Sequence, residues 1–554
     1  MFKGVFDKKA EQVVKHNRTA MKKVLLLIVC VTVFTGPATF GRDEPLANEG
    51  KAGLYANSIE RVLRLREDEV DLARAALIIS EKWSHLVYGR RYLSKLDNMA
   101  LEIRARLEKK NLRANYHAIP MINEYLFDEL GFKAVSEASD PNDLFLHSVL
   151  DRKRGYCLSL SILYLSLGER LGLPLYGVVV PGHFFVKYDD GRVQFNIETT
   201  SKGGSAPDEH YITKFMVPDD DRSIYMKKLS KIQTLGCFLN NLGNSYCDIG
   251  DTESALLALE TAVQINPSLG ESRANLGNLY LKDGRIEDAL YEYRTALQIN
   301  PNDAKTHSNL GNAYTKRGWL NDAIAQYGYA IELDPNFVQA YKNLAIAYSE
   351  LEMFVQAEVA LKQALILEPK DASLYSQLAD VYKQMGKYRQ AISQYKKALK
   401  IKRNLAEAHY GLAVCYNKLG LVDEETQAYK KALAFQPDMV AAFVGLGNVY
   451  FGKKKYDAAI EQYKKAVRIA PDDGTIHHNL GAAYSNKDDY EQAAAAYLKA
   501  VELEPEMGDA HNGLAFAFYK LKKYDLAARH ITIAEKLGAD VDKKLLRAIN
   551  KKLR

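Results

Sequence analysis

The sequence predicts a mostly helical protein in which a small α+β domain precedes an all-α, right-handed superhelix of repeated helix pairs. Two observations lead to this prediction: a 34-residue period fills the second half of the chain, and near the middle one helical run is followed by three strand-like runs. The 554 residues are 47% apolar and 26% charged, as in an ordinary folded protein. Basic residues exceed acidic ones by only six and the two signs are interleaved, so we expect no nucleic-acid partner.

Residues 1–41 are predicted to be an export signal or an N-terminal membrane anchor. Two lysines precede the twelve-residue apolar run Val24–Thr35, and small residues follow it as far as Gly41. A spanning helix needs roughly twenty apolar residues, which favours export over an anchor. We therefore expect an exported protein, either free in the periplasm or tethered to the membrane and facing the periplasm. Met1 and Met21 are both candidate starts.

Residues 42–225 are predicted to form one domain, with a helical lead-in that ends in an α+β core. Within it, an apolar stripe at helical spacing marks a helix that Gly172 and Pro174 end; its members are Leu158, Ile162, Leu165 and Leu171. Cys157 therefore lies at or just before the N-terminus of this helix. There the helix dipole and the free backbone N–H groups favour a thiolate and can bind an oxyanion.

Three strand-like runs follow this helix: Leu175–Val180, His183–Tyr188 and Val193–Glu198. The dipeptide Asp190–Gly191 is typical of a two-residue hairpin turn, and such a turn places His183 directly opposite Glu198. Directly opposed side chains have Cβ atoms about 4.5–5.5 Å apart, so this imidazole and carboxylate can form a hydrogen bond. Asn196 lies on the same sheet face and is the alternative partner of the histidine.

The second half of the chain repeats every 34 residues, nine times, across residues 236–541. Each unit has leucine at its seventh position, then Gly or Ala, then an aromatic residue three positions later; the leucines are Leu242, Leu276, Leu310, Leu344, Leu378, Leu412, Leu446, Leu480 and Leu514. Each unit is predicted to be two amphipathic helices that must stack on their neighbours to bury their apolar faces. Residues 226–235 are predicted to be a linker helix, and residues 542–554 a capping helix.

The period and the L-G-x-x-Y…A…P pattern of these units resemble the tetratricopeptide repeat. The resemblance implies that the first helix of each unit lines a concave groove that binds proteins or extended peptides. The residue before the repeated leucine is asparagine in five units: Asn241, Asn275, Asn309, Asn343 and Asn479. An asparagine amide can both donate to and accept from a peptide backbone. These asparagines are therefore candidate peptide-binding residues, and the alternative is that they bond neighbouring turns or water.

The order of a helix-start cysteine, a strand histidine and an acid on the next strand resembles the transglutaminase-like superfamily, whose catalytic geometry is shared with papain-type proteases. The stretches that carry this resemblance are PNDLFLHSVLDRKRG, LYLSLGERLGLPLYGVVVPGHFFVK and NIETTSKGG, and the likeness is greatest to a bacterial branch with a helical N-terminal segment. It implies Cys157 as nucleophile, His183 as base and Glu198 as the acid that orients the histidine, with Asn196 as the alternative. The superfamily more often has Asp where this chain has Glu198.

Together these features predict an exported repeat protein whose transglutaminase-like domain performs cysteine acyl transfer on a protein substrate recruited by the repeats. The reaction could be proteolysis, amide hydrolysis or cross-linking. The alternative is a non-catalytic scaffold, in which Cys157 is a small buried hydrophobe and His183 an ordinary strand histidine. We expect no cofactor and no metal, because the sequence has no phosphate loop, no HExxH and no GxGxxG placed after a strand.

Overall fold

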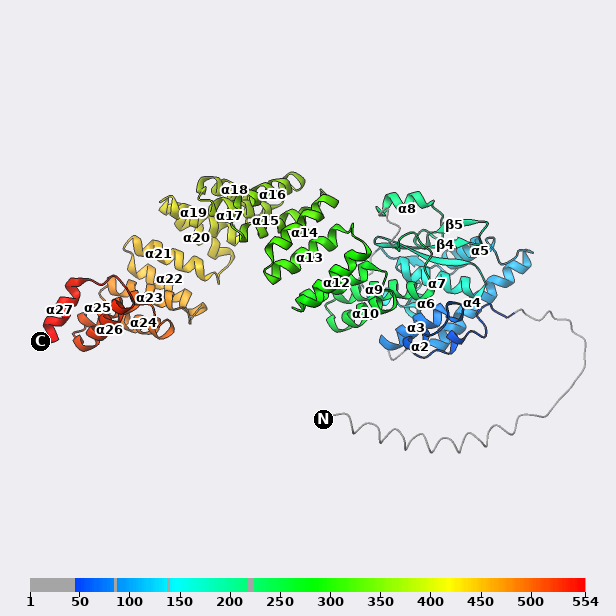
Figure 1. The fold of residues 1–554 in the computed structure, drawn as a ribbon, viewed down its shortest axis with the longest axis horizontal. Helices are drawn as coiled ribbons and strands as arrows, with labels where there is room; N and C mark the ends of the chain where they lie inside the picture. The colour runs from blue at the N-terminus through cyan, green and yellow to red at the C-terminus, as the bar shows by residue number, and fades with distance from the viewer. Residues whose placement is uncertain (1–44, 84–86, 137–139, 218–223, 554) are drawn as a thin grey trace, which may run out of the picture.

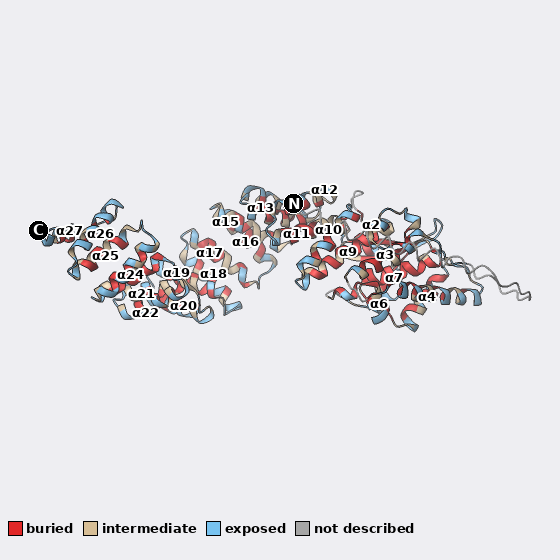
Figure 2. Cartoon of the chain, turned by 90° about the horizontal axis from the view of Figure 1, so that it is seen from below, coloured by how far each residue is buried: buried red, intermediate tan, exposed pale blue. Residues whose placement is uncertain are grey.

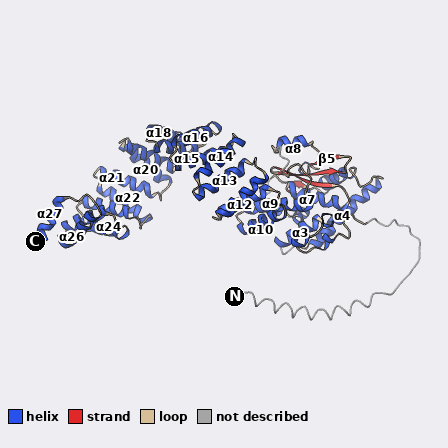
Figure 3. Ribbon diagram, viewed as in Figure 1, coloured by secondary structure: helices blue, strands red, loops and turns tan. Residues whose placement is uncertain are grey.

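The computed structural model describes residues 45–83, 87–136, 140–217 and 224–553, and the predicted export signal lies outside these ranges. Figure 1 shows an elongated molecule, in which the N-terminal helices and strands form one end and the repeat helices extend away from them. Most of the described chain is helical, as predicted, and the strands belong to the N-terminal domain (Figure 3). Within the described ranges, no helix combines the length and apolarity needed to cross a membrane.

The N-terminal domain is built around helix α7, Cys157–Arg170, which is buried along almost its whole length. Its apolar residues are distributed on all sides, so the helix needs protein contacts all around it. The elements that precede it are η1 (Ala52–Tyr55), α2 (Ile59–Val62), η2 (Glu67–Glu69), α3 (Leu72–Trp83), α4 (Gly89–Lys109), α5 (Ala118–Asn123), η3 (Glu124–Glu129), β1 (Lys133–Ala134), η4 (Pro141–Asp143), α6 (Leu146–Arg152) and β2 (Arg154–Gly155).

A three-stranded antiparallel sheet, in the order β3–β4–β5, packs on α7. Its strands are β3 (Leu175–Val180), β4 (His183–Asp189) and β5 (Gln194–Ile197). One face joins the core around α7 through residues such as Val179 and Phe184. On the other face, Phe185 packs with Tyr211 of helix α8, Asp208–Lys214. The short helix η5, Thr199–Ser201, follows β5.

The register of the β4–β5 hairpin differs by two residues from the predicted one. Lys187 pairs with Asn196, which moves Glu198 from a position opposite His183 to a diagonal position. The predicted two-residue turn is wrong because the Asp190 carboxylate accepts hydrogen bonds from the backbone N–H groups two and three residues further on, at 2.9 and 2.8 Å, and holds a longer loop. Because side chains alternate with a period of two, this shift keeps the histidine and the glutamate on one face.

The predicted linker helix 226–235 is wrong in its first half, because residues 226–230 form a turn and an isolated bridge to β3. Met226 N donates to Val179 O at 3.1 Å and Leu229 N donates to Gly177 O at 2.9 Å, which adds this segment to the free edge of β3. Residues 231–235 instead begin the first repeat helix, where Ser230 caps the N-terminus. The edge pairing satisfies backbone groups of β3 that would otherwise lack partners.

Each repeat consists of two antiparallel helices, and the nine pairs follow one another along the chain. The first helices are α9 (Lys231–Asp248), α11 (Gly270–Lys282), α13 (Ala304–Arg317), α15 (Val338–Glu350), α17 (Ala372–Gln384), α19 (Ala406–Lys418), α21 (Val440–Gly452), α23 (Gly474–Asn486) and α25 (Gly508–Lys520). The second helices are α10 (Thr252–Ile265), α12 (Ile286–Ile299), α14 (Leu320–Leu333), α16 (Phe354–Leu367), α18 (Tyr388–Ile401), α20 (Val422–Phe435), α22 (Tyr456–Ile469), α24 (Tyr490–Leu503) and α26 (Tyr524–Lys536). Helix α27, Lys543–Leu553, packs on the last pair.

The small residue after the repeated leucine allows the two helices of a unit to approach closely. A Cβ atom at Gly311 would lie 2.6 Å from the ring of Tyr327, and one at Gly447 would lie 2.5 Å from the ring of Tyr463. At these two positions the tyrosine ring occupies the space that a Cβ atom would need, so glycine lets the ring pack directly on the helix backbone.

The N-terminal domain and the first repeats share one apolar core. A single cluster of buried side chains runs from Ala56 in the lead-in to Ala347 in the fourth repeat. Figure 2 shows buried residues in the helices on both sides of the junction, such as α7 and α9. Across the junction, Phe145 packs edge-on against Phe238 with ring centroids 6.2 Å apart, and Trp83 stacks on Tyr246 at 6.5 Å. The first repeat is therefore packed as an integral part of the N-terminal domain.

A buried carboxylate adds an ionic contact to this junction. Glu169 at the end of α7 accepts from Lys51 at 2.7 Å and from Lys231 of α9 at 2.6 Å, and its side chain is 8% exposed. Burial opposes ionisation, but the charge and hydrogen bond of Lys231, together with those of Lys51, lower the pKa of Glu169. One side chain thus connects the lead-in, the central helix and the first repeat.

The substitution Glu169→Gln should destabilise the junction by about 3 kcal/mol at pH 7, because it leaves two lysines without their buried partner. Since the folded pKa is below the ordinary value of 4.5, this contribution is present above that value and is lost as the pH falls through the folded pKa. Denaturant unfolding in a Trp319→Phe background, where Trp83 at the junction is the remaining tryptophan, checks this by fluorescence. The control Glu287→Gln breaks an exposed ion pair with Arg317 and should cost less than about 1 kcal/mol; equal losses in both variants would contradict the assignment.

Candidate active site

Cys157 is the first residue of α7, as the sequence predicts, and its side chain is 3% exposed. The start of this helix is fixed from two sides. Ser161 Oγ and Thr199 Oγ1 donate to the Cys157 carbonyl at 2.7 and 3.3 Å, and Ser159 Oγ accepts from the Tyr156 backbone N–H at 2.9 Å. The serines of α7 therefore hold the helix terminus and its cysteine in place.

His183 begins β4, and its ring lies between the cysteine and the glutamate. His183 Nε2 lies 2.7 Å from Glu198 Oε2, and the ring lies near enough to Cys157 for the thiol to affect its pKa. Because Nε2 is engaged by the carboxylate, Nδ1 is the nitrogen left for the sulfur. Burial opposes protonation of the imidazole, but the hydrogen bonds and charges of Cys157 and Glu198 outweigh it and raise the pKa of His183 to about 9.

Glu198 is held as a carboxylate that faces the histidine. Its Oε1 accepts from the backbone N–H of Thr200 at 3.0 Å and from the Thr200 hydroxyl, while Oε2 accepts from His183 and from Tyr211 Oη at 3.4 Å. Burial favours the neutral acid, but the hydrogen bonds from His183 and Thr200 lower the pKa of Glu198. The diagonal register explains the use of glutamate, since its longer side chain reaches across the pleat.

Asn196, the alternative partner of the histidine, is engaged elsewhere. Its Nδ2 donates to Asp208 Oδ1 at 2.7 Å and to Ala206 O at 3.0 Å. Lys187 also pairs with Asp208, at 3.0 Å. These contacts attach the start of α8 to the sheet, so Asn196 supports a neighbouring element and forms no bond with His183 among the described residues.

Helix α8 and the residue after it supply an aromatic wall that the sequence analysis did not find. Phe215 stacks on the ring of His183, with centroids 4.8 Å apart and planes inclined by 3°, and Tyr211 stacks at 6.3 Å. Their spacing of four residues on a helical run is the signal that could have suggested a shared face. The wall shields one side of the imidazole from water and limits the ring to one plane.

The cysteine and the histidine open into a cavity of about 720 Å³ that the first three repeats help to line. Cys157 and His183 contribute to one wall, and Asn241, Asn275 and Asn309 contribute to the other. The structure thus brings three of the predicted asparagines together with the predicted nucleophile and base. All three are half-buried.

The remaining asparagines lie away from this cavity. Asn343 donates to Asn312 Oδ1 at 2.7 Å and accepts from Gln339, as the alternative interpretation of these residues predicts, and Asn275 likewise donates to Asn240 Oδ1 at 3.0 Å. Asn479 lies in α23, six repeats further along than Asn275. Within the described chain, no hydrogen bond joins the side chain of Asn241 or Asn309 to another protein group, so these two amides face the cavity with free bonding capacity.

Comparison with known families identifies both parts of the chain. A model of the transglutaminase-like superfamily matches residues 90–219. Models of the tetratricopeptide repeat match residues 243–351, 370–436 and 447–507. The chain therefore carries a transglutaminase-like domain followed by tetratricopeptide repeats, as its sequence resemblance implies. The match to this type of repeat supports proteins or peptides as the class of partner.

Individual relatives match parts of the chain. A UPF0162 protein of Xylella fastidiosa strain Temecula1 is 27% identical over 189 residues, which is 26% of this chain and 67% of that protein. The mouse F-box only protein 21 is 38% identical over 71 residues, 13% of this chain and 11% of that protein. A crystal structure titled as YrrB, a TPR protein with an unusual peptide-binding site, is 26% identical, covers 35% of this chain and 97% of its own, and superposes with a TM-score of 0.29.

The pH dependence of Cys157 alkylation should depend on Glu198. With the pKa of His183 near 9, we expect the alkylation rate to show an upper inflection at about pH 9, where the imidazolium loses its proton. The substitution Glu198→Gln removes one of the charges that raise this pKa, so the inflection should move down by about one unit or more. Stopped-flow alkylation across pH 5–10 measures it. The control Glu209→Gln, at an exposed position of α8, should leave the inflection in place; an unchanged inflection in Glu198→Gln would contradict the role of the carboxylate.

Proposed function

We propose that this protein is an exported cysteine acyl-transfer enzyme that acts on a peptide segment held by its first repeats. The observation that carries the proposal is the shared cavity, because Cys157 and His183 line it together with Asn241, Asn275 and Asn309. Export to the periplasm, free or tethered, is proposed from the apolar run Val24–Thr35 and the residues that flank it.

The arrangement of the three side chains supports a defined sequence of steps. His183 takes the proton of the Cys157 thiol, and Glu198 stabilises the resulting imidazolium. The thiolate attacks an amide carbonyl carbon, and the backbone N–H groups in the first turn of α7 stabilise the oxyanion. The C–N bond then breaks, the amine leaves with the proton from His183, and a thioester remains on Cys157. Water or a second amine attacks the thioester, which gives hydrolysis or cross-linking and regenerates the thiol.

The cavity suits a substrate segment that is extended. Its repeat side carries asparagine amides, which pair with the C=O and N–H groups of a peptide backbone, together with the charged side chains Glu271, Asp303, Lys305 and Asp334. Asn241, Asn275 and Asn309 come from the first helices of successive repeats, so they are distributed along the array and can contact separate residues of one extended peptide. A folded protein would therefore have to present a loop or a terminus.

One observation favours the second candidate function, a non-catalytic scaffold. Cys157 is only 3% exposed, as is common for cysteines that act as small apolar side chains. In that case the repeats would bind partners and the domain would serve as a structural end of the array. An enzyme requires the thiol of Cys157 to be more reactive than a more exposed thiol of the same chain, and a scaffold does not.

Cys247 provides that comparison within the same molecule. It is half-buried, and burial raises its pKa. If His183 activates Cys157, a small electrophile such as iodoacetamide should modify Cys157 at least about tenfold faster than Cys247 at pH 7, although Cys247 is the more exposed. Peptide mass spectrometry of the time course measures both rates in the full chain.

Two variants serve as controls for this experiment. Cys157→Ala should abolish the fast modification, and Cys247→Ala should leave it unchanged. If Cys247 reacts first, or if His183→Ala does not slow the modification of Cys157, the acyl-transfer proposal is wrong and the scaffold function stands.

A further inference from the structure

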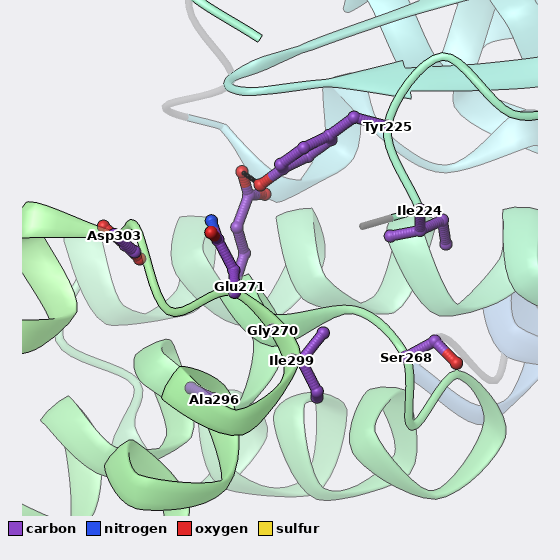
Figure 4. Close-up of a pocket in the computed structure, with 9 residues that line it drawn as sticks. Ile224, Tyr225, Ser268, Gly270, Glu271, Ala296, Ile299 and Asp303 are labelled. Carbon is purple, nitrogen blue, oxygen red and sulfur yellow. Dashed lines mark hydrogen bonds between the residues drawn. The ribbon is translucent and has the colours of Figure 1, made fainter. Parts of the chain in front are cut away.

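A carboxylate from the second repeat lies beside the turn that carries His183. Glu271, in the first turn of α11, accepts from Tyr225 Oη at 2.7 Å. Its carboxylate also lies near the backbone N–H of Gly182, which lowers its pKa. Figure 4 shows Tyr225 and Glu271 pointing toward one another from the two sides of the junction. Glu271 also lines the cavity that contains Cys157 and His183.

The two donors belong to the two segments that frame the histidine. Gly182 is the second residue of the two-residue turn between β3 and β4, with φ +70°, and His183 follows it directly. Tyr225 precedes Met226, whose N–H pairs with Val179 O on the edge of β3. Glu271 therefore links the Pro181–Gly182 turn to the segment at Tyr225 and Met226, and it links both of them to the second repeat.

Comparison among the repeats shows that this burial is specific to the junction. The residue at the position of Glu271 is exposed in all seven repeats that follow: Lys305, Gln339, Ser373, Glu407, Ala441, Thr475 and Asp509. In the second repeat, this position carries a carboxylate and is covered by the N-terminal domain. Glu407 is the same residue type at the same position with no such cover, so it is a matched control.

The environment of Glu271 disfavours the ionised form of its side chain. Burial raises the pKa of Glu271, and the nearby Asp303 carboxylate raises it further, while the hydrogen bonds from Tyr225 and Gly182 and the charge of Lys305 act in the opposite direction. No lysine or arginine in the described ranges forms an ion pair with it. A half-buried carboxylate without an ion pair is weak as a source of stability, which points to a role in geometry.

We propose that Glu271 is a positioning residue of the active site, which holds the Pro181–Gly182 turn and thereby sets the ring of His183 against Cys157. This inference rests on the proposed function in so far as it gives His183 a catalytic task. The carboxylate acts on the Gly182 N–H, one residue before the imidazole, and on Tyr225 beside it, while Phe215 stacks on the ring itself. The second repeat thus supplies a part of the active site that the N-terminal domain lacks.

The first test asks whether Glu271 protects the Gly182 N–H, and it does not depend on catalysis. Hydrogen–deuterium exchange of the full chain should show faster exchange at the Gly182 amide in Glu271→Ala, and parent-like exchange in Glu271→Gln, which keeps an acceptor oxygen, and in the matched control Glu407→Ala. Parent-like protection of this amide in Glu271→Ala would overturn the proposal.

The second test measures the consequence for the histidine. In Glu271→Ala, alkylation of Cys157 by iodoacetamide at pH 7 should be slowed at least about tenfold, and its upper pH inflection should fall below 9. Glu271→Gln should restore most of the parent rate, which a loss of packing alone would not predict. If parent Cys157 reacts rapidly and Glu271→Ala retains the parent rate and inflection, the positioning role is wrong while the proposed function stands. If parent Cys157 itself reacts slowly, the proposed function fails and amide exchange alone decides whether Glu271 holds the turn.

Discussion

The apolar core that joins α7 to the first repeats is the constraint on which the site depends. Because Phe145 packs against Phe238 and Trp83 against Tyr246, helix α9 is held against the N-terminal domain. Glu169 adds an ionic connection between the same elements. Burial of this continuous surface fixes the position of the repeat groove relative to the cysteine, so the groove and the nucleophile meet in one cavity.

The same constraint changes the meaning of the repeats. An array joined by a flexible linker would raise the local concentration of a partner without contributing to the chemistry. Here α9 packs against α7, which carries Cys157. The segment at Met226 pairs with β3, the strand beside the one that carries His183, and Glu271 accepts from Tyr225 of that segment. The first two repeats are therefore part of the domain that holds the site, and the later repeats extend the surface available to a partner.

Local sequence signals predicted the repeats and the helix-start cysteine well, because their determinants recur within a few turns of helix. The 34-residue period and the Leu–Gly–Tyr spacing follow from packing inside each unit, as the contact of Gly311 with Tyr327 illustrates. Cys157 was placed correctly because the apolar stripe and the Gly172 stop define α7 locally. The histidine–glutamate contact was also anticipated, although from a register that is wrong by two residues.

The errors and omissions arise where distant segments decide the structure. The side chain of Asp190 lengthens the hairpin loop and shifts the β4–β5 register by two residues. His183 and Glu198 stay on the same face of the sheet only because this shift is an even number of residues. Residues 226–229 pair with β3, which a local helix signal cannot reveal. Phe215 and Glu271 act on His183 through contacts made only after the chain folds, so neither stands out in the sequence.

The most direct test of the central claim is to look for the thioester itself. The full chain is incubated with a defined set of extended peptides that contain glutamine and asparagine amides, quenched in acid, and analysed by peptide mass spectrometry. The account predicts a hydroxylamine-labile acyl adduct on Cys157, with a lower yield when Asn241 and Asn309 are replaced by alanine and an unchanged yield for Asn404→Ala on an exposed turn. Peptides that bind the repeats but leave Cys157 unmodified would contradict it.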